Sequence, residues 1–140
     1  MAPALEVARF FLAMADEDDE LLSPMKLQKL LYYAQGFHYA ILGQRLFPEH
    51  VLAWEHGPVV REVWEEYRQH GGGGIVPPDD APEFESDTRG VLCDVWRVYG
   101  QFSAWRLREM THDTPPWADT PRNQEISLDA MREYFATQLA

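Results

Sequence analysis

The stretch SPMKLQKLLYYAQGFHYAILG, residues 23–43, carries the start signal, the apolar stripe and the stop signal of one long helix. The hydroxyl of Ser23 can accept a hydrogen bond from a free backbone amide, and Pro24 suits the first helical position, where no amide donor is needed. Gly43 suits the left-handed conformation that ends many helices. Between these signals the apolar residues recur at helical spacing: Leu27, Leu30, Leu31, Ala34, Phe37 and Ile41. The pattern predicts a central core helix over residues 24–42.

The polar residues of this helix lie outside its apolar stripe. A helix that packs one face against a core leaves the other face to solvent. We therefore expect these side chains to be exposed and to offer a secondary contact surface. They are Lys26, Gln28, Lys29 and Gln35.

The segments before this helix differ sharply in character. Residues 4–15 have apolar side chains at helical spacing and predict a first helix. Residues 16–20, DEDDE, are a block of like charge that predicts a solvated connection. The alternative is that this block contacts a basic partner.

After the central helix the pattern changes to short elements. Runs of apolar and β-favouring residues at 45–48 and 51–54 predict two short strands or an irregular hairpin. Residues 55–58, EHGP, predict a turn, and Pro58 suits the first position of a third helix that ends near His70.

The segment 71–86 is rich in glycine, proline and acidic residues and predicts a mobile loop. Within it, Ile75 and Val76 can form a brief strand. The loop differs in composition from the rest of the chain, and partner choice is one role open to it.

The second half of the chain predicts further helices. Residues 91–99 have an amphipathic pattern, and Ser103 can cap the helix that follows. Residues 111–124 are rich in turn-forming residues, although Trp117 is expected to pack back on the body. Ser127 can cap a last helix.

The expected fold is mainly α: a compact bundle of about six helices around the central helix 24–42, with at most a small β-hairpin. The chain of 140 residues has room for one domain with a real core. We expect one domain over residues 1–140, with a core of about 4–138 and the mobile loop at about 71–86.

Composition excludes several classes of function. The formal net charge of −11 opposes a general grip on nucleic acid, which needs clustered basic residues, and favours a basic protein partner. One cysteine allows neither an internal disulfide nor a multi-cysteine zinc site. The N-terminus has no signal-peptide pattern, and no apolar run reaches the ~20 residues of a membrane span. We expect a cytoplasmic protein that binds neither membranes nor nucleic acid.

Motifs for catalysis, metals and cofactors are absent from the sequence. There is no HExxH, no pair of histidines four residues apart and no GxSxG. His50, His56 and His112 could still meet in space, so a metal-dependent hydrolase is kept as a less favoured alternative. The main expectation is no catalytic residue, no metal and no cofactor.

Two loops combine aromatic, proline and histidine residues: WEHGPV at 54–59 and THDTPPW at 111–117. Buried tryptophans contribute much of the binding energy of protein interfaces. The alternative is that both tryptophans only fix the loops to the helical body. The residues that we expect at a partner-binding face are Trp54, His56, Pro58, Arg61, Trp64, His112 and Trp117.

Several of these segments together resemble the Panacea domain family, which includes SocA-like antitoxins and phage-associated GepA-like proteins. The segments are KLQKLLYYAQGFHYA (26–40), LF (46–47), AWEHGPVV (53–60), THDTPPW (111–117) and I-S-x-x-x-M-x-x-Y-F (126–135). Their order and spacing match from Leu5 to Phe135.

The resemblance implies a bacterial or phage antitoxin that neutralises the protein product of a neighbouring toxin gene by direct contact, without catalysis. In SocA-like members it also implies delivery of the toxin to the ClpXP protease, so a proteolytic adaptor for a AAA+ protease is the alternative. No DNA-binding domain is recognised before residue 5. The acidic balance predicts that the toxin is basic and that its association weakens with salt.

Overall fold

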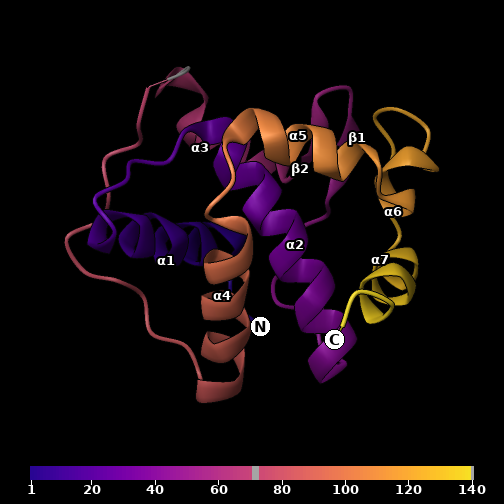
Figure 1. Ribbon diagram of the computed structural model, residues 1–140, viewed down its shortest axis with the longest axis horizontal. Coiled ribbons are helices and arrows are strands. Elements are labelled where there is room, and N and C mark those ends of the chain that lie inside the picture. Colours follow the sequence, from indigo (N-terminus) through magenta and orange to yellow (C-terminus); the bar gives the residue numbers. More distant parts are fainter. Residues whose placement is uncertain (71–72, 140) are drawn as a thin grey trace.

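The computed structural model describes residues 1–70 and 73–139 and is mainly helical (Figure 1). The helices are α1 (Ala4–Glu17), α2 (Pro24–Leu42), α3 (Arg61–Tyr67), the 3₁₀ helix η1 (Arg68–His70), α4 (Ser86–Tyr99), α5 (Ala104–His112), α6 (Pro115–Ala118) and α7 (Leu128–Ala136). The strands β1 (Leu52–Trp54) and β2 (Gly57–Val59) form one antiparallel hairpin. The prediction of a helical fold with a small hairpin is confirmed.

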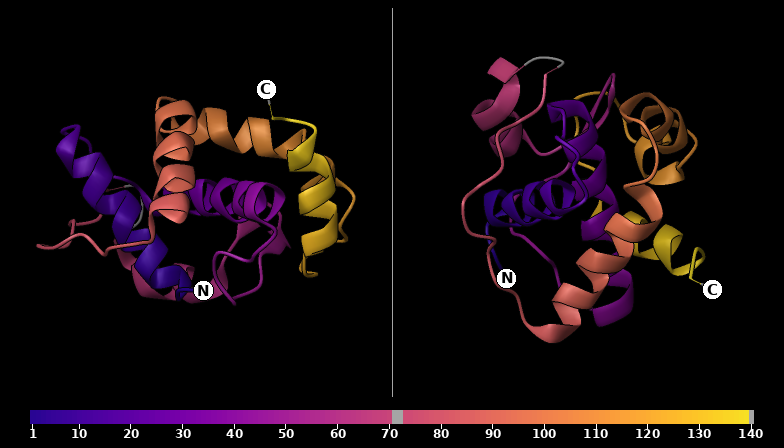
Figure 2. Two further views of the ribbon diagram at one scale, coloured as in Figure 1. Left: turned by 90° about the horizontal axis from the view of Figure 1, so that it is seen from below. Right: turned by 60° about the vertical axis from the view of Figure 1, so that its left-hand side comes forward.

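Helix α2 runs through the middle of the fold, as the sequence predicts (Figure 1). Its first turn is capped by Ser23, whose hydroxyl accepts a hydrogen bond from the amide of Lys26 at 3.2 Å. Gly43 ends it in the left-handed conformation, with φ 69°. Helices α1 and α4 lie on one side, α5 crosses near the start of α2, and α7 lies on the other side (Figures 1 and 2).

A glycine inside α2 allows α7 to pack closely. A Cβ atom at Gly36 would collide with the ring of Phe135, which is fully buried. That ring lies 4.8 Å from the ring of Phe37 and 5.3 Å from that of Tyr32, in the middle of an aromatic cluster. Glycine within a helix costs about 1 kcal/mol relative to alanine. At Gly36 that cost is offset by the docking of a whole helix.

The predicted polar surface of α2 is wrong, because all four of its residues are buried, with 0–6% of their surface exposed. Neighbouring segments cover α2 on every side over residues 26–38, and their backbone groups pair with its side chains. The amide of Gln28 bonds to both backbone groups of Val60. The amide of Gln35 bonds to the backbone of Leu46 and Phe47. These glutamines satisfy irregular backbone that lies inside the protein.

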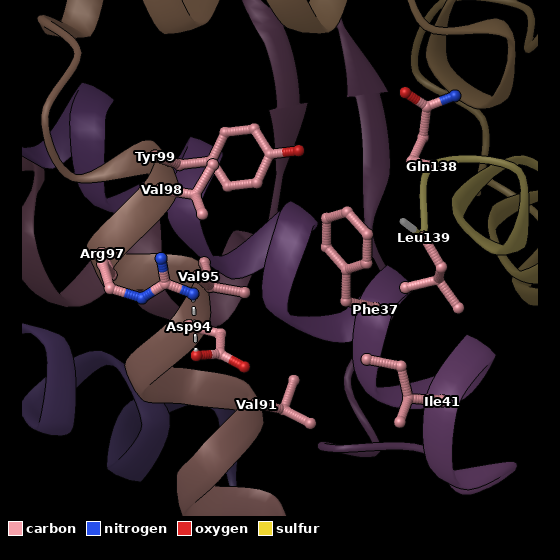
Figure 3. A pocket seen from close by; sticks show the side chains of 10 residues that line it. All are labelled: Phe37, Ile41, Val91, Asp94, Val95, Arg97, Val98, Tyr99, Gln138 and Leu139. Atoms are coloured by element: carbon pink, nitrogen blue, oxygen red, sulfur yellow. Dashed lines mark hydrogen bonds and ion pairs between the residues drawn. The ribbon is translucent and has the colours of Figure 1, made fainter.

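One apolar residue of α2 is also misassigned. Ile41 was expected to face the core, and 49% of its surface is exposed. It lies in the last turn of α2, where the neighbouring helices leave that side open, as the close view in Figure 3 shows.

The predicted strand at 51–54 is confirmed as β1, but its partner is β2 and not the predicted run at 45–48. Residues 45–48 form no strand, because the side chain of Gln35 takes the backbone bonds that a strand partner would take. Leu52 pairs with Val59, and Trp54 pairs with Gly57. Pro58 therefore lies in β2 and not at a helix start, and the following helix begins at Arg61.

Other boundaries differ in detail. Ile75 forms no strand and makes one backbone bond, from its amide to the carbonyl of Leu22 at 2.8 Å. The fourth helix begins at Ser86, and the short helix α6 occupies part of the turn-rich segment 111–124. Residues 71 and 72 of the predicted loop lie outside the described residues, and its mobility stays a prediction.

The acidic segment 16–20 is attached to the body of the protein. Asp18 accepts a hydrogen bond at 2.7 Å from the indole nitrogen of Trp96, and Glu20 accepts one at 2.6 Å from the ammonium of Lys26. At least part of this segment therefore has a structural role. Among the described residues, no helix is both long and apolar enough to cross a membrane.

Candidate functional site

The two lysines of the chain, Lys26 and Lys29, are both buried in α2 but have opposite surroundings. The ammonium of Lys26 donates to a carboxylate oxygen of Glu20 and, at 2.7 Å, to the carbonyl oxygen of Gly100. Only 1% of the surface of Lys29 is exposed. Among the described residues, its Nζ atom has no carboxylate within 4 Å and no hydrogen-bond acceptor. Within that part of the chain, Lys29 is a buried cation without a partner.

Three distant segments meet around this ammonium. Gly57 in the hairpin has φ 122°, a conformation that glycine adopts far more readily than other residues. A Cβ atom at Gly57 would lie 2.8 Å from Cε and 3.1 Å from Nζ of Lys29, and 3.2 Å from Oγ1 of Thr111. The absence of a side chain lets the hairpin lie directly against Lys29. The motifs around residues 29, 57 and 111 therefore form one site.

The environment disfavours positive charge at two groups of this site. Burial lowers the pKa of Lys29 to about 7, and the positive charge of Arg108 contributes to the lowering. Burial also lowers the pKa of His112, again with a contribution from Arg108. The Nε2 atom of His112 is buried without a hydrogen-bond partner among the described residues. An anion placed here would reverse the shift at Lys29.

A cleft of about 200 Å³ opens beside Lys29, between the start of α2, the hairpin and α3–η1. No Asp or Glu lies in its lining. The rings of Trp54 and Trp64 meet edge to face, with centroids 5.6 Å apart, and the guanidinium of Arg68 lies 5.4 Å from the centre of the Trp64 ring. The cleft thus combines aromatic walls with cationic groups. The residues that carry its chemistry are Met25, Lys29, Trp54, His56, Trp64 and Arg68.

A stack of three side chains lies next to the hairpin. The ring of His112 is parallel to that of Trp117, with centroids 4.1 Å apart, and Arg122 lies 3.8 Å from the Trp117 ring. The indole nitrogen of Trp117 donates to the carbonyl oxygen of Trp54 at 2.9 Å. This bond joins the segment 111–117 to the strand that carries the cleft. The two aromatic loops of the sequence are therefore one connected structure.

The seven residues predicted for a partner-binding face have four different placements. Trp54, His56 and Trp64 line the cleft, and His112 and Trp117 form the half-buried stack beside it. Arg61 is exposed on α3, 3.9 Å from a carboxylate oxygen of Glu65. Pro58 is buried in β2. Pro58 can therefore shape the face but not contact a partner in this structure.

Sequence reasoning missed Lys29, Arg68 and Met25 at the cleft. Lys29 looked like a residue of a solvated helix face, and nothing in the pattern marks it as buried. The sequence pattern did not predict Arg68 at the cleft, because α3 continues as a 3₁₀ helix that places its guanidinium over the ring of Trp64. The one available signal was the glycine of the EHGP turn, which indicates a close backbone approach.

A second hollow, of about 310 Å³, lies between the last turn of α2, α4 and the C-terminal residues (Figure 3). Val98 of α4 lies on one side of it and Phe37 and Leu139 on the other, and an ion pair between Asp94 and Arg97, 3.2 Å apart, lies on the α4 side. It contains no buried unpaired polar group of the kind found at Lys29. The described residues contain no group of three histidine, cysteine or acidic side chains that could hold a metal ion.

The fold and the site define a mainly helical protein with an aromatic and cationic cleft beside the start of α2. Residues 27–118 match the model of the family described as antitoxin SocA-like, Panacea domain. This span is 92 of the 140 residues, and the chain belongs to that family. The resemblance of the sequence motifs is thereby confirmed. No curated protein and no solved structure matches the chain significantly.

Family membership supports an antitoxin role at the level of the family and implies a protein partner, a toxin. It also suggests a role without catalysis. The matched span includes α2 from Leu27, the hairpin, α3 and the 111–117 segment, so the cleft and the stack both lie largely within it.

Proposed function

We propose that this protein is the antitoxin of a bacterial or phage toxin–antitoxin pair and that it acts in the cytoplasm, without catalysis, by binding its toxin directly. The observation that carries the proposal is the family match over residues 27–118. We further propose that the toxin binds at the cleft and stack described above, through Trp54, His56 and Trp64 with Arg61, His112 and Trp117 around them.

Three properties support this face. Tryptophan and arginine are the residues most enriched among those that dominate binding energy. The two cleft tryptophans are half-buried, so each retains surface that a partner can cover. The tryptophan of the stack is held from both sides, by His112 and Arg122. Aromatic groups that are already fixed lose little conformational freedom on binding.

Long-range charge supports a basic toxin. The formal net charge of −11 creates an attractive field for a positively charged partner at low ionic strength. The association rate should therefore fall as salt rises, since the Debye length is ~10 Å at 0.1 M salt. Association at an unchanged rate from low to high salt would remove this part of the proposal.

Co-expression tests the function. The neighbouring reading frame is expressed alone and together with this protein, and growth and complex formation are measured. We expect toxicity alone, rescue on co-expression and a stable complex. A harmless neighbour, or rescue with no complex between the proteins, would refute direct neutralisation. Degradation of the neighbour only when a AAA+ protease is present would indicate the adaptor role instead.

Two tryptophan variants test the face. Trp64→Ala should weaken the complex about 30-fold, the value for an interface residue worth about 2 kcal/mol. Trp105→Ala is the matched control, because Trp105 is 62% exposed and does not line the cleft. Equal effects of the two variants, or none from Trp64→Ala, would place the interface elsewhere.

A further inference from the structure

The starting observation is that Lys29 is a buried cation that the described part of the chain does not neutralise. Lys26, three residues earlier in the same helix, has both a carboxylate and a carbonyl partner. A buried charge without a partner is strongly unfavourable, so proteins rarely keep one. The sequence could place an acidic residue beside Lys29, as it does beside Lys26. It places a glycine there instead, Gly57.

The second observation is that Lys29 can be reached. Its side chain is part of the wall of the cleft, whose volume of about 200 Å³ is far above the ~15 Å³ that a single water needs. At Gly57 the hairpin covers one side of the ammonium with backbone alone, because this residue has no side chain. A side chain of another protein can therefore enter the cleft and contact its wall at Lys29, of which 1% of the surface is exposed in the free protein.

The third observation concerns the charge of the cleft. Lys29, Arg68 and His56 line it, and no carboxylate does, although the chain as a whole carries 23 acidic residues and 12 basic ones. Arg68 contacts the Trp64 ring, and its Nε lies 4.0 Å from a carboxylate oxygen of the exposed Glu65. A guanidinium and an ammonium at one cleft are a natural pair of donors for the two oxygens of a carboxylate. The cleft therefore favours a negatively charged ligand.

We propose that this cleft is a receptor for an acidic side chain, Asp or Glu, of the protein that binds this face. This inference rests on the proposed function, because a protein partner supplies carboxylates. The methylene groups of the entering side chain would contact Trp54 and Trp64, and its carboxylate would meet Lys29 and Arg68. Terminal carboxylates are typically captured by clusters of backbone amides, whereas the donors here are side chains.

Binding of a carboxylate in the cleft should change the protonation of Lys29. A carboxylate next to Lys29 favours the charged amine, so binding at pH 8 should bring a proton onto Lys29. The other titratable or charged groups around it are His56 from the hairpin, Arg68 from η1, and Arg108 and His112 from α5. Glu65 of α3 lies 4.0 Å from Arg68, but it is exposed and is not among the residues that line the cleft.

The chain offers a direct readout, because it contains only two lysines. Protein labelled with ¹³C at lysine Cε gives two lysine signals, and Lys29→Met identifies one of them. The Lys29 signal is followed against pH in the free protein, with N-acetylglutamate N-methylamide, and with the matching glutamine compound. We expect the glutamate compound to move the titration of Lys29 upward and the glutamine compound to leave it in place, with Lys26 as internal reference. No difference between the two compounds at saturating concentration overturns the proposal.

The same signals are then measured in the complex with the unlabelled neighbouring toxin. We expect Lys29 to stay protonated up to about pH 9, and calorimetry at pH 8 in buffers of different ionisation enthalpy to give an uptake of about one proton. Lys29→Met should abolish the uptake and weaken binding about 30-fold, as should one Asp→Asn or Glu→Gln change in the toxin. Arg68→Met, an exposed position, should weaken binding less.

The outcomes separate the two proposals. A complex that forms normally, with Lys29 titrating as in the free protein and Lys29→Met binding as tightly as wild type, overturns the acidic-receptor proposal and leaves the antitoxin role intact. Failure of the wild type to neutralise the toxin overturns the antitoxin role, while the free-protein titration still decides the cleft. If a short C-terminal extension of the toxin removes the effect and no side-chain change does, the ligand is the chain terminus and the proposal is wrong.

Discussion

Replacing Lys29 by methionine should make the protein more stable. Methionine keeps the unbranched shape of the lysine stem and removes the ammonium. A folded-state pKa of about 7 against 10.5 in the unfolded chain means that the charge costs about 5 kcal/mol well below pH 7. At pH 7, where Lys29 is half neutral, the cost is about 4 kcal/mol. Lys29→Met should raise the free energy of unfolding by about that amount.

The pH dependence of this effect has a definite sign. Between pH 7 and 10.5 the unfolded chain binds a proton at Lys29 that the folded chain does not, so the stability of the wild type rises with pH. At pH 9 the remaining cost is about 2 kcal/mol. The difference between Lys29→Met and wild type should therefore shrink by about 2 kcal/mol from pH 7 to pH 9.

Urea unfolding of both proteins at pH 7, 8 and 9, at constant ionic strength, measures the difference, in which the titration of other groups largely cancels. Lys26→Met is the matched control in the same helix. It leaves the carboxylate of Glu20 and the carbonyl of Gly100 without their donor and should lower stability by about 1–3 kcal/mol. A Lys29→Met protein that is less stable than wild type, or a difference that is equal at pH 7 and 9, would refute the reasoning.

Four further substitutions test the close packing at glycines and the titration of His38. Gly57→Ala forces a Cβ atom against Lys29 at φ 122° and should lower the free energy of unfolding by about 1–3 kcal/mol. Gly90→Ala is its control: there a Cβ atom meets open space within a helix, and the free energy of unfolding should rise by up to about 1 kcal/mol. Urea unfolding measures both changes. Gly36→Ala should cost about 1–3 kcal/mol by displacing the ring of α7, and an unchanged urea midpoint would contradict the close packing. Burial lowers the pKa of His38, so the free energy of unfolding should fall as pH drops below about 6.5, by at most ~1.4 kcal/mol per pH unit. The free energy of unfolding of His38→Gln should lack this decrease when it is measured over the same pH range.

The sequence predicts well those features that local chemistry determines. Ser23, Ser103 and Ser127 each accept a hydrogen bond from the amide three residues later, as their positions before apolar repeats indicated. Gly43 ends α2 at the predicted residue, and the central position of this helix follows from its long apolar stripe. These signals act over three or four residues and need no knowledge of the fold.

The features that were predicted wrongly depend on contacts between distant segments. Periodicity assigns Gln35 to solvent, yet its amide serves the backbone of residues 46 and 47, and this same contact removes the predicted strand at 45–48. One unrecognised buried amide therefore produced two errors. Lys29 was missed for a related reason. A polar residue in a helix is exposed by default, and only the approach of the hairpin at Gly57 buries it.

The net charge of the protein and the local charge of the cleft would act at different stages of binding. Its net charge of −11 acts beyond contact distance and would attract basic proteins in general, at a rate that salt reduces. The cleft at Lys29 acts only at contact, and its sign is opposite. A basic protein without an acidic side chain at the right place would be attracted and would then cover Lys29 without neutralising it. With a pKa of about 7, Lys29 in such a complex would lose its proton at a cost of less than about 1 kcal/mol at pH 7, whereas a toxin with the matching carboxylate would gain an ion pair with the protonated amine and would be retained longer. The selectivity for a partner therefore comes from the ion pair that a matching carboxylate forms with Lys29.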